Sequence, residues 1–246
     1  MVQTNKLLNE HEVNNLFSRV APRYDLLNNV ISLGTQKIWR HELFNQLQIK
    51  PTDNALDVCC GTGDLAIALA KRISAGRVTG LDFNKEMLEI AKEKTKMIGN
   101  LFLVQGDAMA LPFDDNSFDI VTIGFGLRNV PDADKALSEI YRVLKPGGQF
   151  VSLEMSQPTN PIIKVGWKAY FTAFPLMASL AGGHYHDYQY LKKTSQQFVS
   201  AHQLARMMKA VGFKEVHYQP LNFGAAALHF GNRSEERRVG KECVTE

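Results

Sequence analysis

Short apolar segments alternate with longer segments of helical periodicity from residue 54 onward. The longer segments, such as residues 65–73 and 136–144, repeat apolar side chains every three or four positions, as amphipathic helices do. Alternation of this kind predicts a parallel sheet whose strands are joined by crossover helices. The short apolar segments, which we interpret as the strands, cover residues 55–59, 77–81, 101–104, 118–123 and 149–153.

The pattern changes on both sides of this alternating core. Before it, apolar residues at helical spacing from Val13 to Val20 predict an amphipathic helix that ends at Pro22. A second helix is predicted over residues 36–47. The elements predicted after the core are a helix over residues 201–211 and two strands, residues 215–219 and 225–230, paired as an antiparallel hairpin.

The composition of the chain fits one substantial core. The 246 residues are 45% hydrophobic, and we expect a single domain over residues 1–231. The 28 basic and 25 acidic residues nearly balance, and no basic run is long enough to follow a nucleic-acid backbone, so we expect no nucleic-acid partner. Residues 232–246 are polar and lack periodicity, which predicts a disordered tail.

Cysteine usage and hydropathy indicate the compartment. Cys59 and Cys60 are adjacent and Cys243 lies near the C-terminus, so the sequence shows neither a disulfide framework nor metal-ligand spacing. We therefore expect no metal and a reducing, cytoplasmic environment. No apolar run approaches the length of about eighteen residues that a membrane span needs, which predicts a soluble protein.

The strongest local signal is a glycine-rich turn after the first predicted strand. Asp57 lies in that strand, and Gly61, Thr62 and Gly63 lead into a predicted helix. Glycines at such a turn let a ligand approach the backbone closely. A dinucleotide site would carry a third glycine where this chain has Ala66, which weakens a nicotinamide cofactor without excluding it.

Acidic residues follow three successive predicted strands. Asp57 and Asp64 flank the glycine turn and would repel a pyrophosphate, yet they suit a cofactor with an ammonium and a sulfonium group, as S-adenosylmethionine has. Asp82 is placed to accept hydrogen bonds from ribose hydroxyls with either cofactor. Asp107 could accept from an adenine amino group while the N–H of Ala108 meets a ring nitrogen.

Several longer sequence blocks resemble one family, the ubiquinone/menaquinone biosynthesis C-methyltransferases. The resemblance covers roughly residues 11–231. It implies the class I S-adenosylmethionine-dependent methyltransferase fold, a Rossmann-like seven-stranded, mostly parallel sheet with a C-terminal antiparallel hairpin and added N-terminal helices. The matching blocks are residues 24–34, Trp39-Arg40, residues 125–130, residues 142–150 and residues 154–156.

The resemblance also implies a cofactor site and a substrate. Thr62, Asp82, Asp107 and Ala108 would contact S-adenosyl-L-methionine, with the glycines shaping the turn. The aspartate at 107 stands where relatives often carry asparagine, which keeps the acceptor and adds charge. The implied substrate is demethylmenaquinol, an isoprenoid quinol methylated in the last step of menaquinone biosynthesis. A ubiquinone-pathway benzoquinol or another small phenol is the alternative substrate.

Methylation of a quinol carbon requires the neighbouring hydroxyl to lose its proton. A phenol with a pKa near 10 is mostly protonated at neutral pH, so the site must remove that proton or stabilise the anion. Arg128 suits the stabilising role because its guanidinium stays charged. Asn129 and Tyr24 could complete a hydrogen-bond relay to the ring oxygens. A histidine, His184 or His186, could accept the proton or lie on the rim of the pocket, and the base stays open.

Residues 11–50 and 157–195 flank the core in roles that the family resemblance suggests. We expect the first to form a helical lid and the second a substrate-pocket insertion. Aromatic and apolar residues between Ile162 and Leu180 could line a path for an isoprenoid tail, or simply pack as core. The same stretch could dock peripherally on the inner face of the cell membrane, with Lys164 and Lys168 near anionic lipid. The oligomeric state stays open, with a homodimer among the alternatives.

Two other classes of function share the glycine turn. A nicotinamide-dependent oxidoreductase would use the same strand, turn and helix, and a non-catalytic binding protein would keep the cofactor site without chemistry. The acidic strand ends and the longer family blocks favour the methyltransferase.

Overall fold

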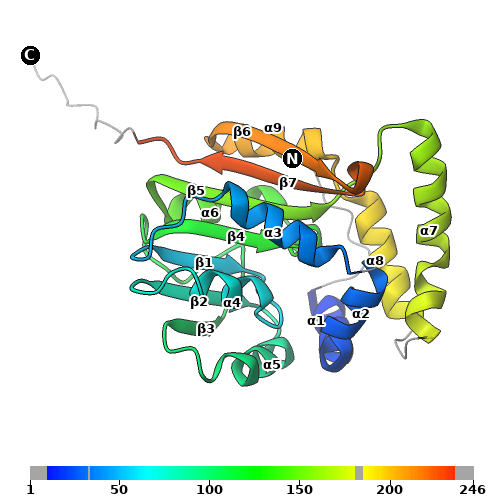
Figure 1. Cartoon of the computed structure of the whole chain (residues 1–246), viewed down its shortest axis with the longest axis horizontal. Coiled ribbons are helices and arrows are strands. Elements are labelled where there is room, and N and C mark those ends of the chain that lie inside the picture. Colours follow the sequence, from blue (N-terminus) through cyan, green and yellow to red (C-terminus); the bar gives the residue numbers. More distant parts are fainter. Residues whose placement is uncertain (1–9, 33, 181–184, 236–246) are drawn as a thin grey trace, which may run out of the picture.

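A seven-stranded sheet forms the centre of the molecule (Figure 1). The computed structural model describes residues 10–32, 34–180 and 185–235. Strand order is β3-β2-β1-β4-β5-β7-β6, and β7 runs antiparallel to both of its neighbours while β1 to β5 pair in parallel. The strands are β1 Asn54–Val58, β2 Arg77–Asp82, β3 Leu101–Gln105, β4 Phe118–Gly124, β5 Leu144–Met155, β6 Lys214–Leu221 and β7 Ala226–Asn232. The predicted fold class, including the C-terminal hairpin, is confirmed.

Helices cover both faces of this sheet. On one face α6 and α9 bury their apolar stripes against residues such as Leu56 and Val121, and on the other face α3 and α4 pack on residues such as Ala55 and Ile120. Neighbouring strand residues thus serve opposite cores, as the two-residue repeat of a strand requires. The helices are α1 Glu10–Val20, α2 Tyr24–Ile31, α3 Gln36–Gln46, α4 Asp64–Ala70, α5 Lys85–Thr95, α6 Ala133–Val143, α7 Pro161–Leu180, α8 Tyr185–Gln197 and α9 Ala201–Val211; η1 Ala21–Arg23, η2 Leu127–Asn129 and η3 Asn222–Gly224 are 3-10 turns.

A third layer of helices gathers at one end of the sheet. Figure 1 shows α1, α2, α7 and α8 at that end, and their cluster buries Leu16, Leu27, Ala178, Tyr188 and Leu191. The predicted first helix is confirmed, but the chain then continues through η1 into α2, which the sequence patterns did not predict. A helix of two turns has too few apolar repeats to stand out in a periodicity search.

α7 is the longest helix and continues through Pro175. Proline interrupts one backbone hydrogen bond, and a long helix that packs on its neighbours can absorb this loss. Within the described part of the chain, no helix combines the length and the hydrophobicity needed to cross a bilayer.

The C-terminal strands extend past their predicted ends. β6 includes Pro220, which an edge strand tolerates because that position need not donate to a ladder. β7 reaches Asn232, and the Arg233 side chain donates to the carbonyls of Tyr141 and Arg142 at 2.8 Å. The irregular tail predicted from residue 232 therefore begins later, and residues 236–246 lie outside the described part of the chain.

Candidate active site

A cavity of about 770 Å³ opens where the parallel strands end. Its wall combines residues that follow four adjacent strands: Gly61 after β1, Asp82 at the end of β2, Asp107 after β3 and Gly124 at the end of β4. Ligands of open α/β sheets bind at this edge because the strand order reverses there and leaves a crevice. We call this the first cavity.

The glycine turn has a left-handed backbone at both of its glycines. Gly61 and Gly63 have φ values of +54° and +87°, which residues with a Cβ rarely adopt. The neighbouring Cys59 has a positive φ as well, at +54°. A Cβ on Gly126 would lie 2.4 Å from the Cβ of Cys59, so the loop after β4 packs directly on the turn. The turn after β1 and the loop after β4 therefore form one continuous part of the cavity wall.

Asp82 lines the first cavity with its carboxylate already fixed. One oxygen accepts the N–H of Gly61 at 2.8 Å and the other accepts the N–H of Asn84 at 2.8 Å. Burial raises the pKa of Asp82, while these backbone donors oppose the shift. Each oxygen keeps a second lone pair, so the carboxylate can accept from a ligand without moving.

Asp107 and Ala108 line the same cavity. Asp107 accepts the backbone N–H of Met109 at 2.8 Å, which turns the chain sharply after β3. The segment from there to Ser117 has little regular structure, so something else must hold it.

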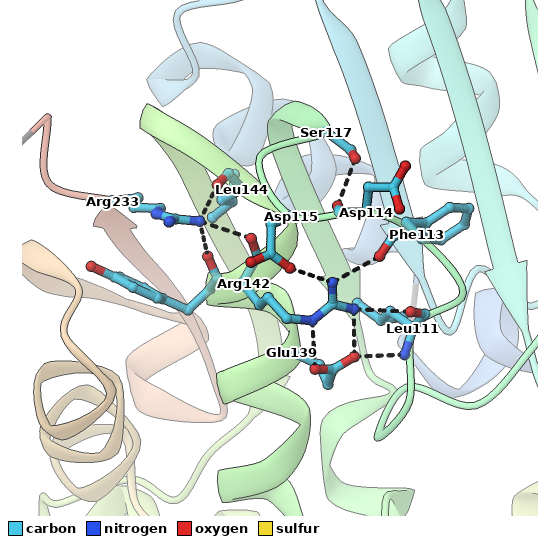
Figure 2. A network of polar contacts seen from close by, with 10 residues as sticks. Leu111, Phe113, Asp114, Asp115, Ser117, Glu139, Arg142, Leu144 and Arg233 are labelled. Atoms are coloured by element: carbon cyan, nitrogen blue, oxygen red, sulfur yellow. Dashed lines mark hydrogen bonds and ion pairs between the residues drawn. The ribbon is translucent and has the colours of Figure 1, made fainter. Parts of the chain in front are cut away.

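Figure 2 shows how α6 holds that segment through Arg142. The guanidinium donates to both carboxylate oxygens of Glu139 at 2.8 Å and to the carboxylate of Asp115 at 2.8 Å. It also donates to the carbonyls of Phe113 at 2.8 Å and Leu111 at 3.0 Å, which uses all five of its N–H donors. The irregular wall of the first cavity is thus fixed to a helix beneath it.

Three predicted site residues do not line the cavity. Asp57 is buried beneath the turn and accepts the Thr122 hydroxyl at 2.7 Å; burial raises the pKa of Asp57 to about 7. Thr62 is also buried, and its hydroxyl donates to Asp25 at 2.6 Å. Gly63 begins α4 and shapes the turn from behind the cavity wall.

Asp64 faces away from the cavity as well, against the expectation that it would attract a cationic ligand. Its carboxylate pairs with Lys94 at 2.6 Å and with Arg40. Burial alone would raise the pKa of Asp64, but the hydrogen bonds from these two cations outweigh it and lower the pKa. Since Lys94 also binds Asp25 at 2.7 Å, this cluster attaches α2 and α3 to the glycine turn.

A second cavity of about 480 Å³ lies between the added helices. Tyr24, Phe125 and Arg128 line both cavities, so the two meet at these side chains. The remaining wall of the second cavity is largely apolar and aromatic and includes Trp39, Met155, Ile163, Trp167, Tyr170, Phe171 and Leu191.

Arg128 is the buried cation at this junction. Its side chain is 9% exposed, and its Nη1 donates to Glu154 at 2.9 Å. The Phe125 ring lies beside the guanidinium, 5.5 Å from centroid to Cζ. The other terminal nitrogen, Nη2, has no hydrogen bond within the described part of the chain, which leaves two N–H donors for a ligand.

Tyr24 and Asn129 lie differently with respect to the two cavities: Tyr24 lines both, and Asn129 lines one. Burial raises the pKa of Tyr24, although the nearby positive charge of Arg128 opposes the shift. Tyr24 therefore stays a neutral hydroxyl that can donate. Asn129 lines only the first cavity, and its amide donates to the Phe125 carbonyl at 3.2 Å. This contact holds the turn that carries Arg128, and a relay through Asn129 stays a prediction.

Sequence patterns missed part of the wall. His11 and Phe17 of α1 line the first cavity, and so does Phe83, the residue after Asp82. A large aromatic directly after a strand-end acid is a signal that could have been used. Tyr190 lines the first cavity, whereas His186 is exposed and lines neither cavity. His184 lies outside the described residues.

The hydrogen-bond acceptors that line the first cavity suit an organic cofactor. Over residues 10–32, 34–180 and 185–235 no three histidine, cysteine, aspartate or glutamate side chains converge as metal ligands would. The first cavity offers fixed carboxylates and backbone groups, which match a ligand that carries hydroxyl donors and positive charge.

Comparisons with known proteins agree with this geometry. Residues 5–233 match the ubiE/COQ5 methyltransferase family. The demethylmenaquinone methyltransferase of Lactobacillus johnsonii is 55% identical over 241 residues, which cover 96% of this chain and 98% of that protein. The protein of the same name from Lactiplantibacillus plantarum is 51% identical over 228 residues, covering 91% and 96%.

Solved structures share the fold at lower identity. A SAM-dependent methyltransferase from Aquifex aeolicus matches with a TM-score of 0.59 and 17% identity, over 78% of this chain and 88% of that one. This likeness bears on the fold alone, whereas the sequence matches confirm the family resemblance. They favour a methyltransferase over the oxidoreductase that the glycine turn had left open.

Proposed function

Because the chain belongs to the ubiE/COQ5 methyltransferase family, we propose that it transfers a methyl group from S-adenosylmethionine to a ring carbon of demethylmenaquinol. The similar proteins named above carry that substrate in their names. The observation that carries the proposal is the meeting of two cavities, one acidic and one apolar, at Tyr24, Phe125 and Arg128. A methyl donor and a quinol ring must come together at such a junction.

The first cavity holds the cofactor in this proposal. Asp82 accepts from the ribose hydroxyls with a carboxylate that Gly61 and Asn84 already orient. Asp107 and Ala108 face the adenine, on the segment that Arg142 fixes. When bound, the cofactor supplies an electrophilic methyl group on a sulfonium.

Arg128 stabilises the substrate oxygen. The quinol hydroxyl would first lose its proton to water, and the resulting phenolate oxygen would carry the negative charge that makes the neighbouring ring carbon nucleophilic. That carbon would then take the methyl group as the carbon–sulfur bond breaks and S-adenosylhomocysteine leaves, and the ring carbon would finally release its own proton to water. The free Nη2 donors of Arg128 can hydrogen-bond the phenolate oxygen in a site where burial strengthens the interaction. The guanidinium has only N–H donors and no acceptor, so it cannot take up the hydroxyl proton.

The second cavity takes the quinol ring and the start of its tail. Its aromatic and aliphatic wall offers an apolar surface to a naphthalene ring. Ile163 and Trp167 of α7 belong to this wall, and in this proposal the prenyl chain of the substrate follows them.

The outer face of α7 contacts the membrane in this proposal. Ile162 and Val165 are 82% and 70% exposed, and Lys168 is exposed on the same helix. Apolar side chains beside a lysine suit an anionic lipid surface, and an isoprenoid quinol resides in the bilayer.

Vesicle sedimentation tests this membrane contact: replacing both Ile162 and Val165 by glutamate should abolish binding to anionic vesicles. The matched control Ile38→Glu, at an exposed isoleucine of α3, should retain it. Equal binding by all variants would contradict the membrane contact.

Purified protein, S-adenosylmethionine and reduced demethylmenaquinol test the reaction itself. We expect a product heavier by one methyl group on the ring, detected by mass spectrometry, and none when the quinone is kept oxidised. A related benzoquinol supplied in parallel tests the substrate. Faster turnover of the benzoquinol would overturn the menaquinone assignment, and absence of any methylated product would overturn the function.

A further inference from the structure

Arg128 has a buried acidic partner that belongs to neither cavity. Glu154 lies in β5 with a side chain 1% exposed, and its Oε2 accepts from Arg128 Nη1 at 2.9 Å. Glu154 lines neither cavity, whereas Arg128 lines both. We propose that Glu154 is a positioning residue for methyl transfer, which holds the Arg128 guanidinium so that Nη2 points to the quinol oxygen.

Arg128 depends on this one carboxylate. Its Nε is buried without a hydrogen-bond partner, and Glu154 is the acceptor that the described part of the chain offers to its guanidinium. A buried guanidinium without a counter-charge is strongly unfavourable, and an arginine side chain has many rotamers. Glu154 therefore both offsets the charge and selects the orientation, whereas the Phe125 ring alone would fix neither.

Glu154 is itself held through one carboxylate oxygen, while its Oε1 is buried and has no hydrogen-bond partner within the described part of the chain. Its Oε2 also accepts the N–H of Met155 at 3.1 Å. Its backbone lies in the sheet, opposite Ala227 of β7. One residue before it, the Leu153 carbonyl accepts the N–H of Phe125 at 2.8 Å, which places the turn that carries Arg128 against this end of β5. The anchor of the guanidinium is thus part of the central sheet.

The inference rests on the proposed function, and a double-mutant cycle separates the two. The variants are Glu154→Gln, Glu154→Asp, Arg128→Ala and the double variant Arg128→Ala with Glu154→Gln. The amide oxygen introduced by Glu154→Gln can still accept the hydrogen bonds from Arg128 and from the N–H of Met155, but the side chain has no charge. We expect Glu154→Gln to lower kcat by about 10-fold to 100-fold, less than the loss of an oxyanion donor itself, with KM and the dissociation constant for S-adenosylhomocysteine changed less than about 2-fold.

Two further results are expected. Adding Glu154→Gln to Arg128→Ala should lower kcat no further, because Glu154 acts through Arg128. Glu154→Asp, which keeps the charge on a shorter arm, should recover part of the activity lost in Glu154→Gln. The control Glu93→Gln makes the same change at an exposed carboxylate that pairs with Lys96, and it should leave kcat unchanged.

The proposed function and the role of Glu154 can fail separately, and the kinetic results distinguish the two cases. If the wild-type protein forms no methylated quinol, the proposed function fails and the role of Glu154 fails with it. If the wild type is active and Glu154→Gln is equally active, only the role of Glu154 fails. The role of Glu154 also fails if Glu154→Gln lowers kcat equally in the wild type and in Arg128→Ala. It fails as well if Glu154→Gln weakens S-adenosylhomocysteine binding as much as it lowers kcat, and either result would indicate a structural role.

Discussion

The two cavities are built in different ways. The first is walled by strand ends, and its carboxylates are held by backbone N–H groups, as Asp82 is by Gly61 and Asn84. The second is walled mainly by helices outside the sheet, with Phe125 and Met155 at its sheet side, and its apolar side chains are held by packing. A wall that belongs to a sheet tolerates little adjustment, whereas packed helices can vary to suit different substrates. We therefore expect substitutions in the first cavity to change cofactor binding and those in the second to change substrate selection.

Arg128 stands at the boundary, and its loss should have the largest effect. Arg128→Ala should lower kcat by about 100-fold to 1000-fold, because it removes the donors that stabilise the phenolate oxygen formed when the quinol hydroxyl loses its proton. Arg128→Lys should recover little, since a lysine lacks the planar fork that reaches both Glu154 and the substrate. Steady-state kinetics with calorimetry of S-adenosylhomocysteine binding measures both quantities. A parallel loss of binding and turnover would assign Arg128 to the structure rather than to the reaction.

Asp82 tests the cofactor cavity. Asp82→Ala should weaken binding of S-adenosylhomocysteine by about 1 to 3 kcal/mol, since it removes charge-assisted hydrogen bonds. The matched variant Asp64→Asn changes an acid two residues past Thr62 that is paired away from the cavity, and it should have the smaller effect. Calorimetry measures the affinity of both variants for S-adenosylhomocysteine. Equal losses of affinity would contradict the assignment of Asp82 as the ligand contact.

Ile163 tests the apolar cavity. Ile163→Ala should raise KM for a long-tailed demethylmenaquinol by about 5-fold, equivalent to about 1 kcal/mol of lost apolar contact. The affinity for S-adenosylhomocysteine should not change, because Ile163 lines only the second cavity. A substrate truncated to the ring should show no increase in KM. If both substrates were affected alike, the tail would not run along α7.

Asp57 should affect stability rather than turnover, and its titration shows whether it belongs to the cavity or to the core. An unfolded aspartate has a pKa of about 3.9, and burial raises the pKa of Asp57 to about 7. Its contribution to the free energy of unfolding is therefore fully present below pH about 4 and lost as the pH rises to about 7. Asp57→Asn does not titrate and can still accept the Thr122 hydroxyl.

Urea unfolding at pH 4.5 and pH 8 tests this linkage. The free energy of unfolding of Asp57→Asn relative to wild type should rise by at least about 1 kcal/mol from the lower to the higher pH. An unchanged difference would mean that the folded protein ionises Asp57 at its ordinary pKa.

The strand-end residues could be predicted because local pattern and topology suffice for them. A parallel sheet brings the ends of consecutive strands to one edge, so Asp82 and Asp107 had to lie near the glycine turn. Asp64 also lies beside the turn, yet its direction depends on Lys94 and Arg40, which come from distant parts of the chain. Sequence proximity to a site does not fix which way a charged side chain faces.

The second cavity could be predicted only in outline. The aromatic and apolar residues between Ile162 and Leu180 indicated part of this wall, but not that α2 and α3 would contribute to it. Glu154 lay in one of the family blocks but was given no role, although a glutamate inside an apolar strand is a usable signal because an unpaired charge there would be costly. The partner of such a charge has to be found in the structure.

The most direct test of the two-cavity account is a crystal structure with S-adenosylhomocysteine and a reduced naphthoquinol analogue. The account predicts the ribose hydroxyls on Asp82 in the first cavity, the ring in the second cavity, and a ring oxygen within hydrogen-bond distance of Arg128 Nη2. A nucleoside bound away from Asp82, or a ring whose oxygens do not reach Arg128, would contradict it.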